Sequence, residues 1–259
     1  MLIASPDHWH AIPTIYACMA GKDVYTEKPD SHNILESCTM AAAARKHRRV
    51  VQMGTQARSG PHMKEANEYI ARGSLGKVRY ATAWESMKQG SLGHPEDEKA
   101  PKEVDYDMWL GPAPKRPFNR LRFHGNWRWF FDYGTGDVGN DGVHRIDYAR
   151  WALQTGLEAQ GEKLPDLPRS VSASGGKFYF DDAQQWPDTL MANFDYGNCL
   201  LTYEMRIWSP YKLHDEAEGA AIYGDKGYVI LASGRWRAFR RGGALVKESS
   251  GGSNLDQTS

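Results

Sequence analysis

The sequence predicts a mixed α/β protein in which a short parallel α/β region precedes a larger α+β region. Two observations support this fold class. Strand-like and helix-like patterns alternate over residues 1–57, an order typical of a parallel sheet with crossover helices. In the last third of the chain, strand-like runs follow one another through short turns such as YGDKG at residues 223–227, which predicts a mostly antiparallel sheet. We therefore expect two domains, at residues 1–57 and 58–259.

The first region is expected to contain three strands and two helices. MLIAS has the apolar character of a buried strand, and the helix after it stops at Gly21. One face of this helix carries its larger apolar residues, which are Ile12, Ile15, Tyr16 and Met19. The expected elements are, in order, a strand at 1–5, a helix at 6–23, a strand at 23–29, an alanine-rich helix at 36–49 and a strand at 50–55.

The second region begins with a helix that ends at Gly73, followed by a strand at 77–86 whose alternation predicts half-exposure. Residues 87–125 are rich in proline, glycine and charge and predict a long loop, and residues 127–153 end in a helix. The last third predicts strands within 169–180, 189–197, 198–207, 218–231 and 235–241. The polar tail at 248–259 is expected to be loose.

Composition and charge exclude several classes of function. The chain carries 32 basic and 32 acidic side chains with no dense Lys/Arg stretch, so we expect neither a nucleic-acid nor an anionic-membrane partner. Cys18, Cys38 and Cys199 lie far apart and indicate no disulfide framework and no cysteine-based metal site. No apolar run is long enough to span a bilayer. A cytoplasmic location is favoured, although an export signal could have preceded Met1.

The stretch GTGDVG at residues 134–139 matches the dinucleotide fingerprint G-x-G-x-x-G at each glycine. A working fingerprint needs a strand before it, a helix after it and, about 20 residues on, a second strand that ends in an acid. Glu158 has the expected spacing, but residues 153–166 contain no apolar run that could form this strand. We therefore do not expect GTGDVG to bind a pyrophosphate.

The same stretch opens a helix that carries several polar residues. Four of them share one face at helical spacing, namely Asp137, Asn140, His144 and Asp147. Three glycines would let another segment or a ligand approach the backbone closely, namely Gly136, Gly139 and Gly142. This pattern suits a polar site, and it suits equally well a capped helix with a satisfied histidine.

Three stretches form an ordered set along the chain. They are ASPDHWH…AGKDVYTEKP within residues 4–29, WRWFFDYGTGDVGNDGVHRIDYARWAL at 127–153, and AAIYGDKGYVIL at 220–231. Together they resemble the Gfo/Idh/MocA family of sugar and inositol dehydrogenases, and Glu27-Lys28-Pro29 is the most specific element. The resemblance implies that residues 1–57 are the C-terminal half of a Rossmann-like NAD(P)-binding domain that lacks its fingerprint half. Residues 58–259 would be the substrate-binding α+β domain with a large open sheet, through which a homo-oligomer would form.

The resemblance implies an oxidoreductase that uses NAD or NADP and acts on a sugar, glycoside or inositol hydroxyl. Lys28 would take part in the proton relay, because a lysine beside a reacting hydroxyl can stabilise developing alkoxide charge. His144 would share the proton, since histidine titrates near neutrality. Asn140 stands where the family usually has an aspartate, and an amide can position a hydroxyl but cannot accept its proton. Asp137 or Asp141 could then carry the charge.

Further residues are implied for the cofactor and the substrate. Pro6 and His10 would lie beside the nicotinamide, and Glu27 would hydrogen-bond a ribose hydroxyl. Pro29 would be cis, so that Lys28 points into the cleft. The pair Trp127 and Arg128 would approach the cofactor, where the arginine fork suits a pyrophosphate. The substrate pocket would be shaped by Trp84, Glu85, Arg122, His124 and Asp141.

Three other functions stay open. A redox-assisted glycosidase or lyase on the same scaffold would use the cofactor without net turnover. A chain without the fingerprint half could instead be a non-catalytic binding or oligomerisation module. Metal-dependent sugar isomerisation would use Asp7, His8, His10 and His144. No third ligand accompanies the His8–His10 pair at suitable spacing, so we expect no metal.

Overall fold

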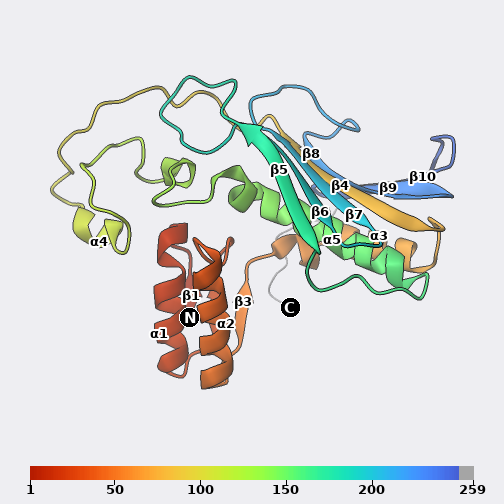
Figure 1. Ribbon diagram of the computed structural model, residues 1–259, viewed down its shortest axis with the longest axis horizontal. Coiled ribbons are helices and arrows are strands. Elements are labelled where there is room, and N and C mark those ends of the chain that lie inside the picture. The colour runs from red at the N-terminus through yellow and green to blue at the C-terminus, as the bar shows by residue number, and fades with distance from the viewer. Residues whose placement is uncertain (251–259) are drawn as a thin grey trace. The chain divides into compact units, whose positions relative to one another are not determined.

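The computed structural model describes residues 1–250, which form two compact units, each built from separate stretches of chain (Figure 1). The first unit comprises Met1–Gly54, Gly90–Asn140 and Phe180–Pro187, and the second comprises Thr55–Gln89, Asp141–Tyr179 and the described residues from Asp188 on. The predicted fold class is confirmed, because a small parallel sheet precedes a large and mostly antiparallel one. The functional division between residues 57 and 58 stays a prediction.

The first unit contains the parallel sheet, in the order β1-β2-β3. Its regular elements are β1 (Leu2–Ile3), α1 (Ala11–Met19), β2 (Val24–Thr26), α2 (Ile34–His47) and β3 (Val51–Met53). β2 pairs with both neighbours in parallel, with Leu2 opposite Tyr25 and Val24 opposite Val51. α1 and α2 pack side by side (Figure 1). The strand–helix–strand–helix–strand order predicted from sequence is therefore confirmed.

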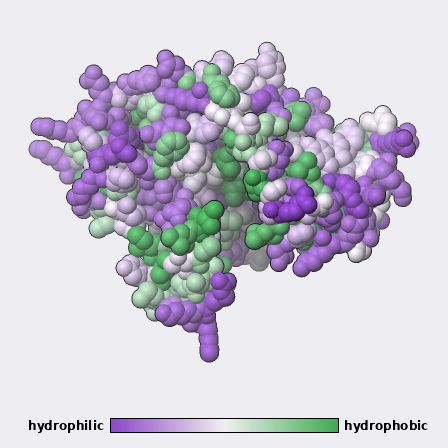
Figure 2. All heavy atoms as spheres, viewed as in Figure 1, coloured by the Kyte–Doolittle hydropathy of each residue, from purple (hydrophilic) through white to green (hydrophobic). Residues whose placement is uncertain are grey.

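The buried face of α1 differs from the face that carries its large apolar residues. Small side chains face the core of the first unit, namely Ala11, Thr14, Ala17 and Cys18. Tyr16 is 64% exposed and Met19 57% exposed. Small residues suit this face because α1 lies directly against α2, and they let the helices approach closely. Figure 2 shows the resulting hydrophobic side chains on the surface of α1 and α2.

The second unit is built on an eight-stranded sheet in the order β11-β10-β9-β8-β4-β7-β6-β5. Every neighbouring pair is antiparallel except β4 and β7, which run parallel with Tyr80 opposite Leu200. The strands are β4 (Val78–Ser86), β5 (Ser170–Gly176), β6 (Thr189–Asp195), β7 (Leu200–Arg206), β8 (Glu218–Gly224), β9 (Gly227–Ala232), β10 (Arg235–Arg240) and β11 (Leu245–Ser250). β11 is the strand that the sequence did not predict, and the rest of the predicted loose tail lies outside the described residues.

β4 is much more buried than its sequence alternation predicts. Ala81, Ala83 and Trp84 are completely buried, as is Glu85. The reason is position: β4 is a central strand, and α5 (Val143–Glu158) packs against it and its neighbour β8. α3 (Pro61–Ala71) contacts α5, β9 and β10. The predicted half-exposed strand is therefore wrong in its burial and right in its position.

The irregular segments contain short helical turns. They are η1 (Asp7–Trp9), η2 (Gln56–Ser59), α4 (Tyr106–Leu110), η3 (Asn126–Trp129) and the π-helical turn η4 (Val138–Gly142). α4 interrupts the predicted loop at 87–125 and is capped by Asp105, whose carboxylate accepts from the Met108 amide at 3.0 Å. None of the helices within residues 1–250 has the length and apolar character that a membrane span requires.

Candidate active site

A pocket of about 160 Å³ lies at the carboxyl edge of the parallel sheet. Ser5 and Asp7 follow β1, and Glu27 and Lys28 follow β2, so parallel pairing brings both segments to the same edge. The lining residues, all in the first unit, are Ala4, Ser5, Asp7, Glu27, Lys28, Pro29, Trp127, Arg128 and Asn140. We refer to this cavity as the Lys28 pocket. It brings together five of the residues that the sequence predicted for the site.

The ammonium group of Lys28 is held by Asn140. Lys28 Nζ donates to the Asn140 backbone carbonyl and to its side-chain Oδ1, the latter at 3.2 Å. The Asn140 amide nitrogen in turn donates to Asp137 Oδ1 at 3.3 Å. The Lys28–Pro29 peptide bond is cis, as the sequence predicted. Lys28 is thus directed to a fixed point beside an amide and a buried carboxylate.

Asp7 is a site residue that the sequence analysis did not assign to proton transfer. It is 3% exposed, and its Oδ2 accepts a hydrogen bond from Thr135 Oγ1 at 2.9 Å. Burial raises the pKa of Asp7, while the Thr135 hydrogen bond and the charges of His10, Lys28 and His32 act to lower it. A buried carboxyl with a raised pKa beside a lysine is a candidate acid or base. The available signal was its position shortly after the strand predicted at residues 1–5, of which only Ile3 is buried in the structure.

Glu27 follows β2 at the same edge of the sheet and lies close to Gly54. Its carboxylate accepts from the Lys28 backbone amide at 3.3 Å. A Cβ atom at Gly54 would lie 3.0 Å from the Tyr25 hydroxyl and 3.2 Å from the Glu27 carboxylate. A side chain at Gly54 would therefore crowd the Glu27 carboxylate.

The two histidines of SPDHWH contact backbone carbonyl groups around the pocket through their ring nitrogens. His10 is 1% exposed, and its ring nitrogens lie 2.5 Å from the Pro29 carbonyl and 2.7 Å from the Ser5 carbonyl. His8 is also buried, with Nε2 3.0 Å from the Trp109 carbonyl, and burial lowers its pKa. His10 thus joins the segments after β1 and β2. Pro6, predicted for the cofactor, is not among the residues that line the Lys28 pocket.

Trp127 and Arg128 form one wall of the Lys28 pocket. The Arg128 guanidinium carbon lies 4.8 Å from the centre of the Trp127 ring, a cation–π contact. Arg128 Nη1 donates to the Gly125 carbonyl, which fixes the side chain. Arg128 Nε is buried and has no hydrogen-bond partner among residues 1–250. A cationic donor is therefore available in the wall.

The glycines of GTGDVG are required by packing. A Cβ at Gly134 would lie 2.4 Å from the Arg128 Cα, and one at Gly139 would lie 1.8 Å from Thr135 Oγ1. The stretch before them, Asn126–Trp129, is a 3₁₀ turn and not a strand. These glycines therefore bring the Arg128 and Thr135 segments close to the turn. Close approach at Gly136, which lies against Trp186, and at Gly139 is as predicted from the sequence.

Residues 77–186 match the model of the Gfo/Idh/MocA oxidoreductase family's C-terminal alpha/beta domain. The predicted resemblance to the Gfo/Idh/MocA family is confirmed. A stretch of 76 residues, 29% of this chain, is 34% identical to YrbE of Bacillus subtilis (strain 168), an uncharacterized oxidoreductase, and covers 22% of that protein.

Several solved structures share the fold of this chain. The WlbA dehydrogenase from Bordetella pertussis, in complex with NADH and UDP-GlcNAcA, has a TM-score of 0.62 at 19% identity over 88% of this chain and 54% of that chain. A levoglucosan dehydrogenase, in complex with NADH and levoglucosan, has a TM-score of 0.67 at 19% identity, over 95% of this chain and 60% of that chain. An aldose-aldose oxidoreductase from Caulobacter crescentus, complexed with glycerol, has a TM-score of 0.65 at 19% identity, over 95% of this chain and 61% of that chain. This chain thus spans less than two thirds of the length of these relatives.

His144, the histidine assigned from the Gfo/Idh/MocA resemblance, is buried on α5 in the second unit. The π-helical turn Val138–Gly142 precedes it and widens the helix, so the 3.6-residue spacing used to place four polar residues on one face does not hold across this turn. Asp147 is engaged elsewhere in the second unit, by Arg58 at 2.7 and 2.8 Å. The pairing of Lys28 with His144 stays a prediction.

Three other predicted residues lie in the second unit, and two of them, Trp84 and Glu85, are in its interior. Glu85 is completely buried, accepts from the Tyr203 hydroxyl at 2.7 Å and lies 3.6 Å from Arg145 Nε. Asp141 pairs with Lys88 at 3.4 Å. Trp84 is completely buried and donates through Nε1 to the Glu216 carbonyl at 3.0 Å. These placements favour core and ion-pair roles for Trp84 and Glu85.

Arg122 and His124 lie in the first unit but outside the Lys28 pocket. Arg122 lines a second cavity, and His124 is exposed, with its carbonyl accepting from Trp127 Nε1 at 2.9 Å. Across residues 1–250, no group of three His, Cys, Asp or Glu side chains is arranged to hold a metal ion.

Proposed function

We propose that this chain carries the proton-handling part of an NAD(P)-dependent oxidoreductase that acts on a hydroxyl of a sugar, glycoside or inositol. The observation that carries the proposal is Lys28, which Asn140 holds in a pocket beside the buried Asp7 carboxyl. The site lies at the carboxyl edge of a parallel sheet, where α/β proteins bind their ligands.

The residues of the Lys28 pocket suit the nicotinamide–ribose end of a dinucleotide. Arg128 lines this pocket, and its guanidinium group suits a phosphate oxygen. Glu27, in the same pocket, would accept hydrogen bonds from ribose hydroxyls. His10 and Pro6 would shape the nicotinamide side through the backbone after β1. When bound, the cofactor supplies a hydride acceptor.

The chain's own residues handle the proton. Lys28 would accept or relay the proton of the substrate hydroxyl and stabilise the developing oxyanion. Asn140 would hold both the ammonium group and the hydroxyl in place, because its amide offers a donor and an acceptor. Asp7 would receive the proton from Lys28, since its raised pKa makes a protonated carboxyl accessible. His144 would share the substrate hydroxyl, and Asp141 would supply a charge at the start of α5.

The test is calorimetric titration of the full chain with NADH and NADPH, followed by a screen of sugars, glycosides and inositols monitored through NAD(P)H absorbance. Lys28→Met should reduce turnover by about 10²-fold or more while NADH affinity stays within a few-fold. Lys22→Met, on an exposed residue of the same unit, is the matched control. A folded chain that binds neither nucleotide would contradict the proposal and favour a non-catalytic module.

Asn140 favours a second candidate, in which transient oxidation assists cleavage of a glycoside. An amide at this position orients a hydroxyl without taking its proton, which suits a cycle that returns the hydride after elimination or hydrolysis. Release of sugar from a glycoside without accumulation of NADH would identify this activity. Stoichiometric NADH formation would identify the dehydrogenase.

A further inference from the structure

The stretch GTGDVG at residues 134–139 has no role in the proposed function, yet it lies beside the end of β1. Asp7 follows β1, and the Thr135 hydroxyl donates to Asp7 Oδ2 at 2.9 Å. The backbone amide of His8 donates to the Tyr133 carbonyl at 3.2 Å. This bond joins the residue after Asp7 to a residue just before the stretch. The contact between Thr135 and Asp7 therefore follows from how the two backbone segments run together.

The other end of the stretch lies against the segment after β2. A Cβ atom at Gly139 would lie 3.4 Å from Pro29 Cγ and 1.8 Å from Thr135 Oγ1. Asn140, the next residue, accepts from the Lys28 ammonium group through Oδ1 at 3.2 Å. Glycine at position 139 thus leaves room for the Thr135 side chain and lets the turn approach Pro29 closely. Residues 135–140 therefore contact the buried carboxyl at one end and the ammonium group at the other.

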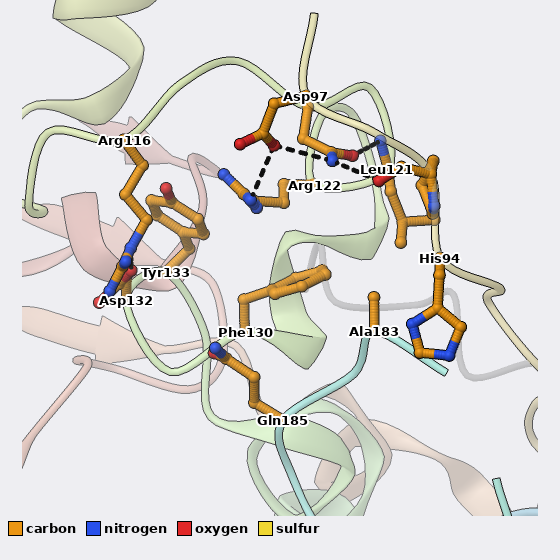
Figure 3. Close-up of a pocket in the computed structure, with 12 residues that line it drawn as sticks. His94, Asp97, Arg116, Leu121, Arg122, Phe130, Asp132, Tyr133, Ala183 and Gln185 are labelled. Carbon is orange, nitrogen blue, oxygen red and sulfur yellow. Dashed lines mark hydrogen bonds and ion pairs between the residues drawn. The ribbon is translucent and has the colours of Figure 1, made fainter. Parts of the chain in front are cut away.

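The stretch is fixed by other groups of the first unit. Trp186 Nε1 donates to the Gly134 carbonyl at 3.0 Å, and a Cβ atom at Gly136 would lie 2.8 Å from Trp186 Cγ. Just before the stretch, Asp132 pairs with Arg116, and its side chain is only 16% exposed. Figure 3 shows these two side chains at one side of the second cavity. The turn therefore presents its hydroxyl from a fixed position.

The hydroxyl of Thr135 acts on the form in which Asp7 stands beside Lys28. Asp7 is 3% exposed, and burial by itself raises its pKa and favours the protonated carboxyl. The Thr135 hydrogen bond opposes this, as do the charges of His10, Lys28 and His32. An ionised Asp7 can take a proton from the Lys28 ammonium group. An N–H bond breaks, an O–H bond forms, and the neutral amine that remains can accept the proton of a substrate hydroxyl.

We propose that GTGDVG is a positioning element of the proton relay. Thr135 holds the Asp7 carboxylate ready to take the proton of Lys28, and it acts through Asp7 as a positioning residue. Gly139 leaves the space that the Thr135 side chain occupies. The inference rests on the proposed function, because the relay belongs to it. The glycine spacing that matches a dinucleotide fingerprint thus serves the placement of a carboxylate.

The experiment follows the titration of Asp7 in the full chain by carbon NMR with isotope-labelled aspartate, the signal being assigned from Asp7→Asn. Thr135→Val keeps the shape of the side chain and removes the donor. The titration midpoint of Asp7 should then rise by about one pH unit, a tenfold change in proton affinity. Thr135→Ser keeps the donor and should restore the wild-type midpoint. Thr155→Val is the matched control and should leave the midpoint unchanged, because Thr155 donates to Asn67 Oδ1 at 2.8 Å in the second unit.

A second variant tests the glycine. Gly139→Ala should raise the midpoint of Asp7 as Thr135→Val does, because the new Cβ displaces the Thr135 hydroxyl. Gly90→Ala, in the same unit, meets nothing within 4 Å and is its control. In the NAD(P)H assay, Thr135→Val should lower kcat about tenfold at neutral pH with KM nearly unchanged, because it acts on the proton and not on binding. Thr135→Ser should restore kcat.

The inference is overturned if Thr135→Val leaves the Asp7 midpoint unchanged, or if Thr135→Ser or Thr155→Val shifts it as far. Oxidation of a sugar by a chain whose midpoint is insensitive to Thr135→Val would leave the redox function intact and refute the role of Thr135. A shifted midpoint in a chain that binds no nucleotide would support the control of Asp7 by Thr135 and refute the redox function.

Discussion

Replacing Thr135 by valine isolates the hydrogen bond that Thr135 donates to Asp7. The bond is 2.9 Å long and its acceptor is 3% exposed, so water cannot easily take the place of the hydroxyl. Hydrogen bonds to charged groups contribute about 1.5–3 kcal/mol, and valine preserves the volume of threonine. We therefore expect Thr135→Val to lower the free energy of unfolding by about 2 kcal/mol at pH 8. In a chain of this size the melting temperature should fall by about 4–8 °C.

The pH dependence of this loss gives a sharper test. The folded-state pKa of Asp7 lies above its usual value, so stability falls as pH rises through the interval between the two values. Thr135→Val removes a hydrogen bond that lowers this pKa, so the pKa of Asp7 should rise further. The fall in stability should then extend to higher pH. Urea denaturation followed by tryptophan fluorescence should show a larger loss at pH 8 than at pH 4. In an Asp7→Asn background the loss should shrink to about 1 kcal/mol. Equal losses at both pH values, or in both backgrounds, would refute the reasoning.

Two further predictions concern packing and buried charge. Gly134→Ala should destabilise the chain by about 1–3 kcal/mol, because its Cβ would lie 2.4 Å from the Arg128 Cα; Gly90→Ala, which meets nothing within 4 Å, should change the urea midpoint little. Glu85→Gln should cost about 3 kcal/mol because it breaks a buried pair with Arg145, whereas Glu162→Gln, in a half-exposed pair with Arg79, should cost less than about 1 kcal/mol. If either variant loses no more free energy of unfolding than its control, the packing or burial assigned to that position is wrong.

Local sequence patterns predicted most of the helices and strands. They predicted site residues only where those residues directly follow a strand. The strand patterns at residues 1–5 and 23–29 place Lys28 just after a parallel strand. The contact between Lys28 and Asn140 joins residues 112 positions apart, and only the family resemblance suggested their roles. Asp7 was named only as a possible metal ligand, because its carboxyl becomes unusual only once Thr135 and the sheet edge bury it.

The errors in burial have a common cause. The sequence pattern placed the large side chains of Tyr16 and Met19 on the buried face, but the contact between α1 and α2 selects small side chains such as Ala17. β4 alternates in sequence and yet is buried, because its neighbours and α5 enclose it. The second cavity, lined by Arg122, has no periodic signal in the sequence, because ion pairs between irregular segments form its walls.

The position of β4 in the large sheet has a consequence for how the chain is made. Tyr80 on β4 bonds to Thr202 on β7, 122 residues later, and β8 on its other edge is synthesised later still. Both edges of an apolar strand therefore wait unpaired until the C-terminal third has left the ribosome. Such long-range pairing slows folding and leaves the nascent chain open to aggregation through β4. We expect newly made chains to need chaperone protection up to the completion of β8.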